Sequence, residues 1–216
     1  DRGLTKIPDS VSDEDALFLG DILSSGYWGA QLAEISPGDS VAVIGAGPVG
    51  MCAMQSARLF GAGKVIALDL SQKRLDYAMA QGLCDDVILC GEGSVEQQIR
   101  SLTQGRGADA VIECAGNADS FQTAWQIARP NAVVAIVAMY EQPQTLPLQR
   151  MYGKNLIFKT GGVDGCHCAE TLRLIEQGKI DTTPLITHTF PLEDIEAAYA
   201  LFENHRDGVI KVAIVP

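Results

Sequence analysis

The sequence lacks the long apolar runs of a membrane-spanning protein. Polar or charged residues interrupt its apolar stretches before they reach the roughly 18 residues that a membrane helix requires. Residues 1–6 also lack the basic and then apolar pattern of a secretory signal. With 47% hydrophobic and 20% charged residues, the composition is that of a globular protein, and we expect no membrane partner.

Positive charge is also scarce. The chain has 16 lysines and arginines against 27 acidic residues, which gives a formal net charge of −11. This balance argues against nucleic acid as a partner, because binding to a nucleic acid backbone depends on clustered lysines and arginines. It does not exclude an anionic cofactor, since the backbone N–H groups of a helix N-terminus and one or two local cations can hold phosphate.

The six cysteines include no Cys-x-x-Cys pair. Four lie in or beside segments that we expect to be buried, which favours reduced thiols in a cytoplasmic protein over a disulfide framework. Cys166, His167 and Cys168 are too close together to complete a tetrahedral zinc site alone, and no other Cys or His is near in sequence. We expect their loop to line the mouth of a cofactor site.

Short β-rich runs alternate with helical stretches along most of the chain. Runs 41–44 and 133–137 are apolar on both faces, which is typical of strands that are covered by helices on both sides of a sheet. This alternation predicts an α/β fold with a doubly wound, Rossmann-type parallel sheet. The expected strands are 40–44, 64–70, 87–89, 108–114, 132–137 and 156–159, and the expected helices are 49–60, 72–81, 95–103 and 119–128.

The two ends of the chain do not continue this rhythm. Residues 13–32 form a helical stretch, and the tail from residue 181 contains Pro184, Pro191, a helix over 192–204 and an alternating strand over 209–215. We interpret both ends as parts of another structural unit.

A glycine loop, Gly45-Ala46-Gly47-Pro48-Val49-Gly50, joins the first expected strand to the first helix. Gly45 allows the tight turn, Gly47 lets the backbone approach a pyrophosphate, and Gly50 lets the helix pack closely on the strand. The helix N-terminus then presents unpaired N–H groups to the phosphates. The loop predicts a nicotinamide dinucleotide site, with Pro48 and Val49 in it. The alternative is a similar fold that binds S-adenosylmethionine or no ligand.

Asp69 ends the second expected strand, 19 residues after Gly50. Its carboxylate is placed to accept hydrogen bonds from the adenosine ribose and repels a 2′-phosphate, which favours NAD over NADP. Arg74 is a further cofactor candidate, although a residue five positions on also fits a side chain that faces solvent or packs its stem.

Several motifs, in order, resemble those of the zinc-dependent medium-chain alcohol dehydrogenases. They are residues 21–30, 37–50, 56–62, 107–116, 185–192 and 210–214. That family has an N-terminal catalytic domain with a zinc-binding Cys and a Gly-His-Glu motif, and many members have a four-cysteine structural-zinc lobe. None of these occurs here. The resemblance therefore implies the C-terminal part of such an enzyme, with a missing N-terminal catalytic domain as its partner. Residues 25–180 would be the NAD-binding Rossmann domain, and 1–24 and 181–216 segments of the catalytic domain.

The resemblance also assigns roles to single residues. Asp21 lies where family members have their third catalytic zinc ligand, although an ordinary helix-surface aspartate is the alternative; without its co-ligands we expect no tight zinc. Ser25 resembles the hydroxyl residue that flanks the nicotinamide in catalysis, and Val49 the side chain behind that ring. Lys211 resembles a basic residue that reaches the pyrophosphate, but a surface lysine fits equally well.

Ala115, Val137 and Gly161 follow the fourth, fifth and sixth expected strands, at the edge of the sheet where ligands bind. Their backbone groups could hold the nicotinamide carboxamide. We expect His188 to be a hydrogen-bonded structural residue. No Tyr-x-x-x-Lys and no Gly-x-Ser-x-Gly occurs, so the short-chain dehydrogenase and α/β-hydrolase mechanisms are not indicated.

By resemblance, the parent enzyme oxidises a small secondary alcohol, polyol or similar hydroxy compound. Zinc would lower the pKa of the alcohol, which then transfers hydride to NAD; this chain alone would be inactive. Two alternatives stay open, a non-catalytic NAD-binding module and the cofactor domain of a zinc-independent reductase. We also expect a homo-oligomer, dimer or tetramer, paired through the sheet edge after Arg150.

Overall fold

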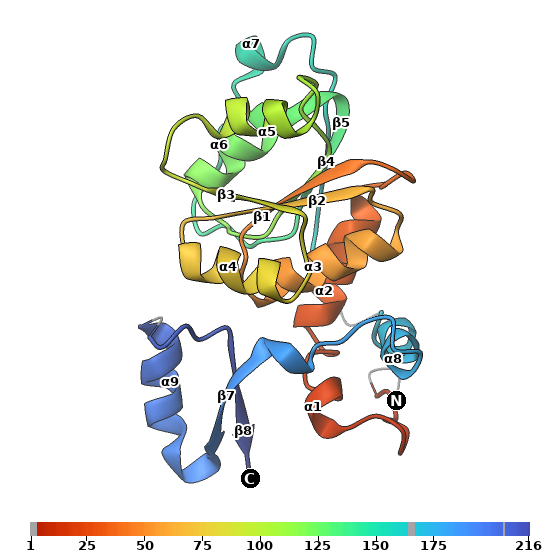
Figure 1. Ribbon diagram of the computed structural model, residues 1–216, viewed down its shortest axis with the longest axis vertical. Coiled ribbons are helices and arrows are strands. Elements are labelled where there is room, and N and C mark those ends of the chain that lie inside the picture. The colour runs from red at the N-terminus through yellow and green to blue at the C-terminus, as the bar shows by residue number, and fades with distance from the viewer. Residues whose placement is uncertain (1–3, 164–166, 205) are drawn as a thin grey trace.

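The computed structural model describes residues 4–163, 167–204 and 206–216. A six-stranded parallel sheet has the order β3-β2-β1-β4-β5-β6, so the chain reverses its direction of winding beside β1 (Figure 1). This order confirms the predicted doubly wound Rossmann-type fold. The strands are β1 Ser40–Ile44, β2 Lys64–Asp69, β3 Asp86–Leu89, β4 Ala108–Glu113, β5 Ala128–Ile136 and β6 Ile157–Thr160.

Helices cover both faces of the sheet (Figure 1). Val41 and Val43 of β1 belong to the core on the face of α2, α3 and α4, whereas Ala42 and Ile44 belong to the core on the face of α5 and α6. The alternation of β1 between two buried faces explains its unbroken apolar sequence. The helices are α1 Asp13–Ala16, α2 Ile22–Leu32, α3 Pro48–Leu59, α4 Gln72–Ala80, α5 Val95–Leu102, α6 Ala118–Ile127, α7 Leu148–Met151, α8 Cys168–Glu176 and α9 Ile195–Glu203.

Several elements differ from expectation. The helical stretch 13–32 is broken into α1 and α2, because Phe18 and Leu19 turn into the core between them. Strand β5 begins at Ala128, four residues earlier than the apolar run 132–137 indicates. Helix α8 follows β6 and begins at Cys168, which we had expected in a loop at the mouth of the cofactor site.

The tail forms a βαβ unit, in which the helix and the last strand were predicted and the first strand was not. Strands β7 (Ile186–Pro191) and β8 (Lys211–Val215) pair in parallel across α9, with the short 3-10 helices η1 (Thr183–Leu185) and η2 (Leu192–Asp194) before and after β7. This two-stranded sheet is separate from the six-stranded one. In Figure 1 it lies, with α1 and α8, beyond the layer of α2, α3 and α4.

Side-chain contacts join the two ends of the chain. The Thr183 hydroxyl donates to the Asp15 carboxylate at 2.6 Å, and the Thr182 hydroxyl to the Asp15 carbonyl at 3.2 Å. Both ends are also tied to the Rossmann core, since the Gln55 side chain of α3 makes two hydrogen bonds to the Asp181 backbone. The two ends thus contact each other and α3, on the side of the helix layer that faces away from the sheet (Figure 1).

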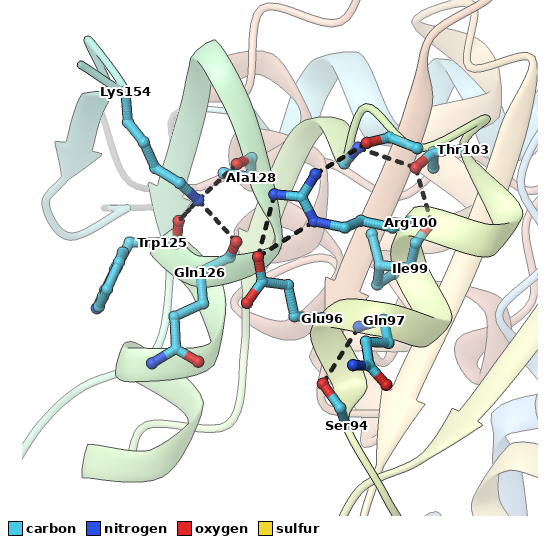
Figure 2. Close-up of polar contacts among 12 residues, drawn as sticks. Ser94, Glu96, Gln97, Ile99, Arg100, Thr103, Trp125, Gln126, Ala128 and Lys154 are labelled. Atoms are coloured by element: carbon cyan, nitrogen blue, oxygen red, sulfur yellow. Dashed lines mark hydrogen bonds and ion pairs between the residues drawn. The ribbon is translucent and has the colours of Figure 1, made fainter. Parts of the chain in front are cut away.

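Lys154 binds the last carbonyl groups of α6 (Figure 2). The Lys154 ammonium donates to the carbonyls of Trp125, Gln126 and Ala128 at 2.9, 2.7 and 3.0 Å. These carbonyls have no partner within the helix, so the ammonium satisfies them and complements the helix dipole. Among the residues that the structure describes, no helix is long and apolar enough to cross a membrane.

Candidate functional site

The glycine loop forms the predicted turn between β1 and α3. Gly45 has a φ of +98°, in the left-handed region, and its N–H donates to the Leu68 carbonyl at 2.7 Å. A Cβ at Gly50 would lie 1.7 Å from the Gly45 carbonyl oxygen, so only glycine lets α3 start this close to β1. A Cβ at Gly47 would meet nothing nearer than Arg74 Nη1 at 3.9 Å. The turn is therefore closed behind Gly50 and open in front of Gly47.

The N-terminus of α3 faces this opening without a side-chain cap. Gly47 is the N-cap residue and makes no side-chain hydrogen bond, while Pro48 occupies the first turn, where a missing N–H costs nothing. The remaining N–H groups of that turn have no partner in the helix. Together with the helix dipole they can bind a phosphate.

Asp69 lies beside the loop, at the carboxyl end of β2. Its Oδ2 accepts the Ala46 N–H at 2.7 Å, and its Oδ1 accepts the Ser71 N–H at 2.8 Å. These bonds fix the carboxylate against the glycine loop. Each oxygen keeps a lone pair for another donor, such as a ribose hydroxyl.

A cleft of about 720 Å³ opens over the carboxyl ends of β1, β2 and β4. Of the predicted cofactor residues, five line it: Gly45, Gly47, Asp69, Arg74 and Ala115. Arg74 thus lies in the cleft, whereas its spacing from Asp69 also allowed it to face solvent. The volume and the position at the switch point of strand order fit the adenosine and pyrophosphate part of a dinucleotide.

Val137 and Gly161, which were also predicted to bind the cofactor, lie outside this cleft and beside α2. A Cβ at Gly29 of α2 would be 2.5 Å from Val137 Cγ2, and the Trp28 ring lies 3.4 Å from the Cβ position of Gly161. Helix α2 thus connects the ends of β5 and β6. It also crosses α3 closely, since a Cβ at Gly26 would be 2.7 Å from the Ala53 nitrogen.

Ser25 and Asp21 are brought together at the start of α2. Asp21 is the exposed N-cap residue, and its Oδ1 accepts the Ser25 hydroxyl at 3.1 Å. Within residues 4–163, 167–204 and 206–216, no group of three or more His, Cys, Asp or Glu side chains could hold a metal ion. The described residues therefore do not make a complete zinc site.

Lys211, on β8, does not line the cleft, and its ammonium lies over the Phe202 ring at 5.4 Å from the centroid. His188 Nδ1 is 2.9 Å from the Thr187 hydroxyl oxygen. His167 packs edge-on against Tyr27, with centroids 5.4 Å apart, and its Nδ1 is 3.6 Å from Glu170.

The five cysteines in the described ranges are free thiols, and Cys166 lies outside those ranges. Burial raises the pKa of Cys52 to about 12 and, with the charge of Asp85, the pKa of Cys84 to about 11. Cys168 Sγ donates to the Leu19 carbonyl at 3.2 Å. None of these contacts indicates a disulfide framework.

The structure adds cleft residues that the sequence analysis missed. The start of α6 lines the cleft, and there Asn117 and Ser120 form a reciprocal capping box; an Asn three residues before a Ser could have indicated this helix start. Lys73 of α4 lines it as well. Gly208 and Val209 come from the tail, and nothing in the local sequence places them against the glycine loop.

The comparisons with known proteins agree with this architecture. A family model described as zinc-binding dehydrogenase matches residues 48–175. The alcohol dehydrogenase of Cupriavidus necator is 38% identical over 219 residues, covering 99% of this chain and 59% of that protein. The NADP-dependent isopropanol dehydrogenase of Thermoanaerobacter brockii is 34% identical over 222 residues, covering 100% of this chain and 63% of that protein.

Among solved structures, alcohol dehydrogenase TADH from Thermus sp. ATN1 matches with a TM-score of 0.91 at 35% identity, covering 98% of this chain and 60% of that chain. The chain thus spans less than two thirds of the length of these relatives. The fold, the glycine loop and the matches together show that the chain belongs to the zinc-binding dehydrogenase family and corresponds to the C-terminal part of its alcohol dehydrogenases.

Proposed function

We propose that the chain is the NAD(H)-binding part of a zinc-dependent dehydrogenase that oxidises a small secondary alcohol, polyol or similar hydroxy compound. The nicotinamide supplies the hydride acceptor. The observation that carries the proposal is the Asp69 carboxylate, held against the glycine loop in a cleft of dinucleotide size. Because the chain covers 59% of the Cupriavidus necator enzyme, we propose that it is inactive by itself.

The preference for NAD over NADP is decided by opposing charges in the cleft. Asp69 accepts two backbone N–H groups and cannot turn away without leaving both unpaired, so it would face a 2′-phosphate directly. Lys73 and Arg74 also line the cleft and would attract that phosphate. We propose that Asp69 dominates, because two backbone N–H groups hold its carboxylate in place, where it would repel the phosphate.

Calorimetric titration with NADH and NADPH, with and without zinc, tests this preference. We expect NADH to bind at least about tenfold more tightly than NADPH, a difference of about 1.4 kcal/mol, and zinc to have no effect. Asp69→Ser should reverse or abolish the preference. Asp76→Ser, on the exposed side of α4, removes the same charge outside the cleft and should leave the preference unchanged. Tighter NADPH binding by the unaltered chain would overturn the assignment.

We propose that the nicotinamide lies toward α2, flanked by Ser25 and Val49, with the backbone of Val137 and Gly161 near its carboxamide. The contacts of α2 with Val137 and Gly161 support this placement. Asp21 would contribute one zinc ligand in the whole protein, the others coming from outside this chain. In the whole enzyme, Asp21→Asn should lower zinc content, measured by metal analysis. Unchanged zinc content would show that Asp21 is not a ligand, and activity that survives in a whole enzyme without zinc would favour a zinc-independent reductase.

Residues 1–24 and 181–216 are proposed to belong to the catalytic domain that the rest of such an enzyme would contribute. The bonds between Thr183 and Asp15 support this grouping. Helix α8, which the boundary at 180 assigns to the Rossmann domain, also contacts the N-terminal segment, because Ser10 donates to Glu176 at 2.8 Å. The free thiols of the described residues support a cytoplasmic location.

Self-association is proposed through the free edge of β6. A groove of about 520 Å³ lies beside this edge, lined by Leu148, Tyr152 and neighbouring residues. Leu148, Tyr152 and Ile157 are 70%, 95% and 49% exposed, so apolar surface gathers there. Light scattering should show a dimer or tetramer that Ile157→Lys dissociates and Leu192→Lys, on the tail, does not. A monomeric unaltered chain would contradict the proposal.

A further inference from the structure

Glu113, the last residue of β4, is a fully buried acid that does not line the cleft. Its Oε1 accepts the N–H groups of Ala115 and Gly116 at 2.8 and 2.9 Å, and its Oε2 accepts the Tyr140 hydroxyl at 2.5 Å. Burying a carboxylate is costly unless its oxygens are hydrogen-bonded. Three donors meet that requirement here, and all three lie on loops beyond the sheet.

The backbone of Glu113 extends the same connection. Its carbonyl accepts the N–H groups of Val137 and Ala138 at 2.9 and 3.2 Å. One residue therefore holds both the β4 loop (residues 114–117) and the β5 loop (residues 137–140). Since each loop is bound by at least two hydrogen bonds, neither can shift without breaking its contacts with Glu113.

The two loops also touch directly. Gly116 has a φ of +76°, and a Cβ there would lie 2.7 Å from the Met139 carbonyl oxygen. The Tyr140 ring packs edge-on against Phe121 of α6, with centroids 6.0 Å apart. Burial, together with the hydrogen bond and charge of Glu113, raises the pKa of Tyr140, so its hydroxyl stays protonated at neutral pH and can donate.

Each loop belongs to a different half of the site. The β4 loop supplies Cys114, Ala115 and Asn117 to the cleft beside the glycine loop. The β5 loop begins with Val137, which packs against Gly29 of α2, the helix that carries Ser25. The first half fits adenosine and pyrophosphate, and the second is where the nicotinamide is proposed to lie.

We propose that Glu113 and Tyr140 form a clasp that sets the distance between these two loops, so that both halves of a nicotinamide dinucleotide are bound at once. The proposal rests on the proposed NAD(H)-binding function. Glu113 and Tyr140 are positioning residues and do not touch the reacting atoms. When two binding halves are held in register, the second half binds as an intramolecular event. Loosening the clasp removes that advantage and leaves each half-site intact.

Tyr140→Phe is the sharpest test, since it keeps the ring against Phe121 and removes only the hydroxyl. We expect it to weaken NADH binding about tenfold while AMP, which uses one half-site, changes less than about twofold. Tyr199→Phe, on α9 at a residue that is 66% exposed, is the matched control and should change neither. Glu113→Gln keeps one oxygen for Ala115 and Gly116, and its effect should lie between the parent and Tyr140→Phe.

The ratio of the two affinities separates positioning from general destabilisation. An unchanged ratio of NADH to AMP affinity in Tyr140→Phe, whether both bind as before or both are equally weakened, overturns the clasp. If the unaltered chain binds neither ligand, the proposed function fails, and hydrogen exchange of the ligand-free chain then tests the clasp alone. In Tyr140→Phe the amides of Val137 and Ala138, on the β5 loop that loses its bond to the Glu113 carboxylate, should exchange faster; protection equal to that of the parent overturns the proposal.

Discussion

Replacing Gly50 and Gly47 one at a time by alanine separates two roles of the glycine loop, the close packing of α3 on β1 and the approach of a pyrophosphate. At Gly50 the added Cβ would lie 1.7 Å from the Gly45 carbonyl oxygen. An ordinary contact of this kind is about twice as long, so either the loop or the start of α3 must move by more than about 1 Å. The Gly45 N–H is bonded to Leu68 in the central sheet, which prevents the loop from yielding cheaply.

The expected cost of Gly50→Ala is about 3 kcal/mol, at the upper end for overpacking, because the obstructing atom is backbone. For a domain of this size, that corresponds to a fall of about 6–12 °C in melting temperature. The methyl group of Gly47→Ala would meet no atom nearer than 3.9 Å, which is an ordinary van der Waals contact. The φ of this N-cap position, −83°, is also ordinary for alanine. We expect its melting temperature to stay within about 2 °C of the parent.

The order of the two variants reverses for cofactor binding. The methyl group of Gly47→Ala projects into the opening where a pyrophosphate would approach, and it should weaken NADH binding at least about tenfold. Calorimetry and thermal melting on the same preparations measure both effects. A Gly50→Ala variant that melts like the parent would refute the packing argument. Unchanged NADH affinity in a folded Gly47→Ala variant would show that this loop does not contact the phosphates.

Three further changes test other parts of the structure. Asp109 accepts the Ser40 N–H and pairs with Arg129 at 2.6 Å; burial raises its pKa, but the Ser40 and Arg129 contacts outweigh this and leave it lowered. The contribution of Asp109 to the free energy of unfolding is thus present above about pH 4 and is lost as the pH falls through its lowered pKa in the folded state. Asp109→Asn should therefore lower the free energy of unfolding in urea by about 2 kcal/mol at pH 7 and make it less dependent on pH in acid. Lys154→Met removes three hydrogen bonds at the end of α6 and should cost about 1–2 kcal/mol by urea unfolding without changing NADH affinity (Figure 2). Gln55→Ala frees the Asp181 backbone and should speed hydrogen exchange in the tail while β1 stays protected; equal protection of the tail would contradict its attachment through Gln55.

The six-stranded sheet and its glycine loop could be predicted because short stretches of neighbouring residues specify them. A strand buried on both faces is an unbroken apolar run, and a phosphate-binding turn needs glycine at fixed positions. Strand β5 shows the limit. Its first residues, before Ala132, include Pro130 and Asn131, the latter at a φ of +64°. Nothing in that segment resembles a strand, and the neighbouring β4 and the Lys154 carbonyl, which accepts the Asn131 N–H, hold it in place.

The helix packing was not predictable for a different reason. Gly26 lies within the helical stretch 13–32, where sequence alone gives glycine only a small penalty. In the structure it is a point where α2 packs against the backbone of α3, with the Ala53 nitrogen 2.7 Å from its Cβ position. Glu113 is a similar case, since it was part of a recognised motif but its three donors come from two loops that only the fold brings together.

The contribution of the tail to the cleft has a thermodynamic consequence. Gly208 and Val209 line the same cleft as Asp69 and the glycine loop, although they belong to the βαβ unit around α9. A ligand that contacts both walls binds only while the tail is attached, so it must stabilise that attachment by an amount that grows with the logarithm of its concentration. The same linkage runs in reverse, because any contact that holds the tail in place, such as the bond from Tyr77 to the Pro184 carbonyl, raises the affinity of the cleft. The proposed cofactor binding therefore depends on the sheet and its returning tail together.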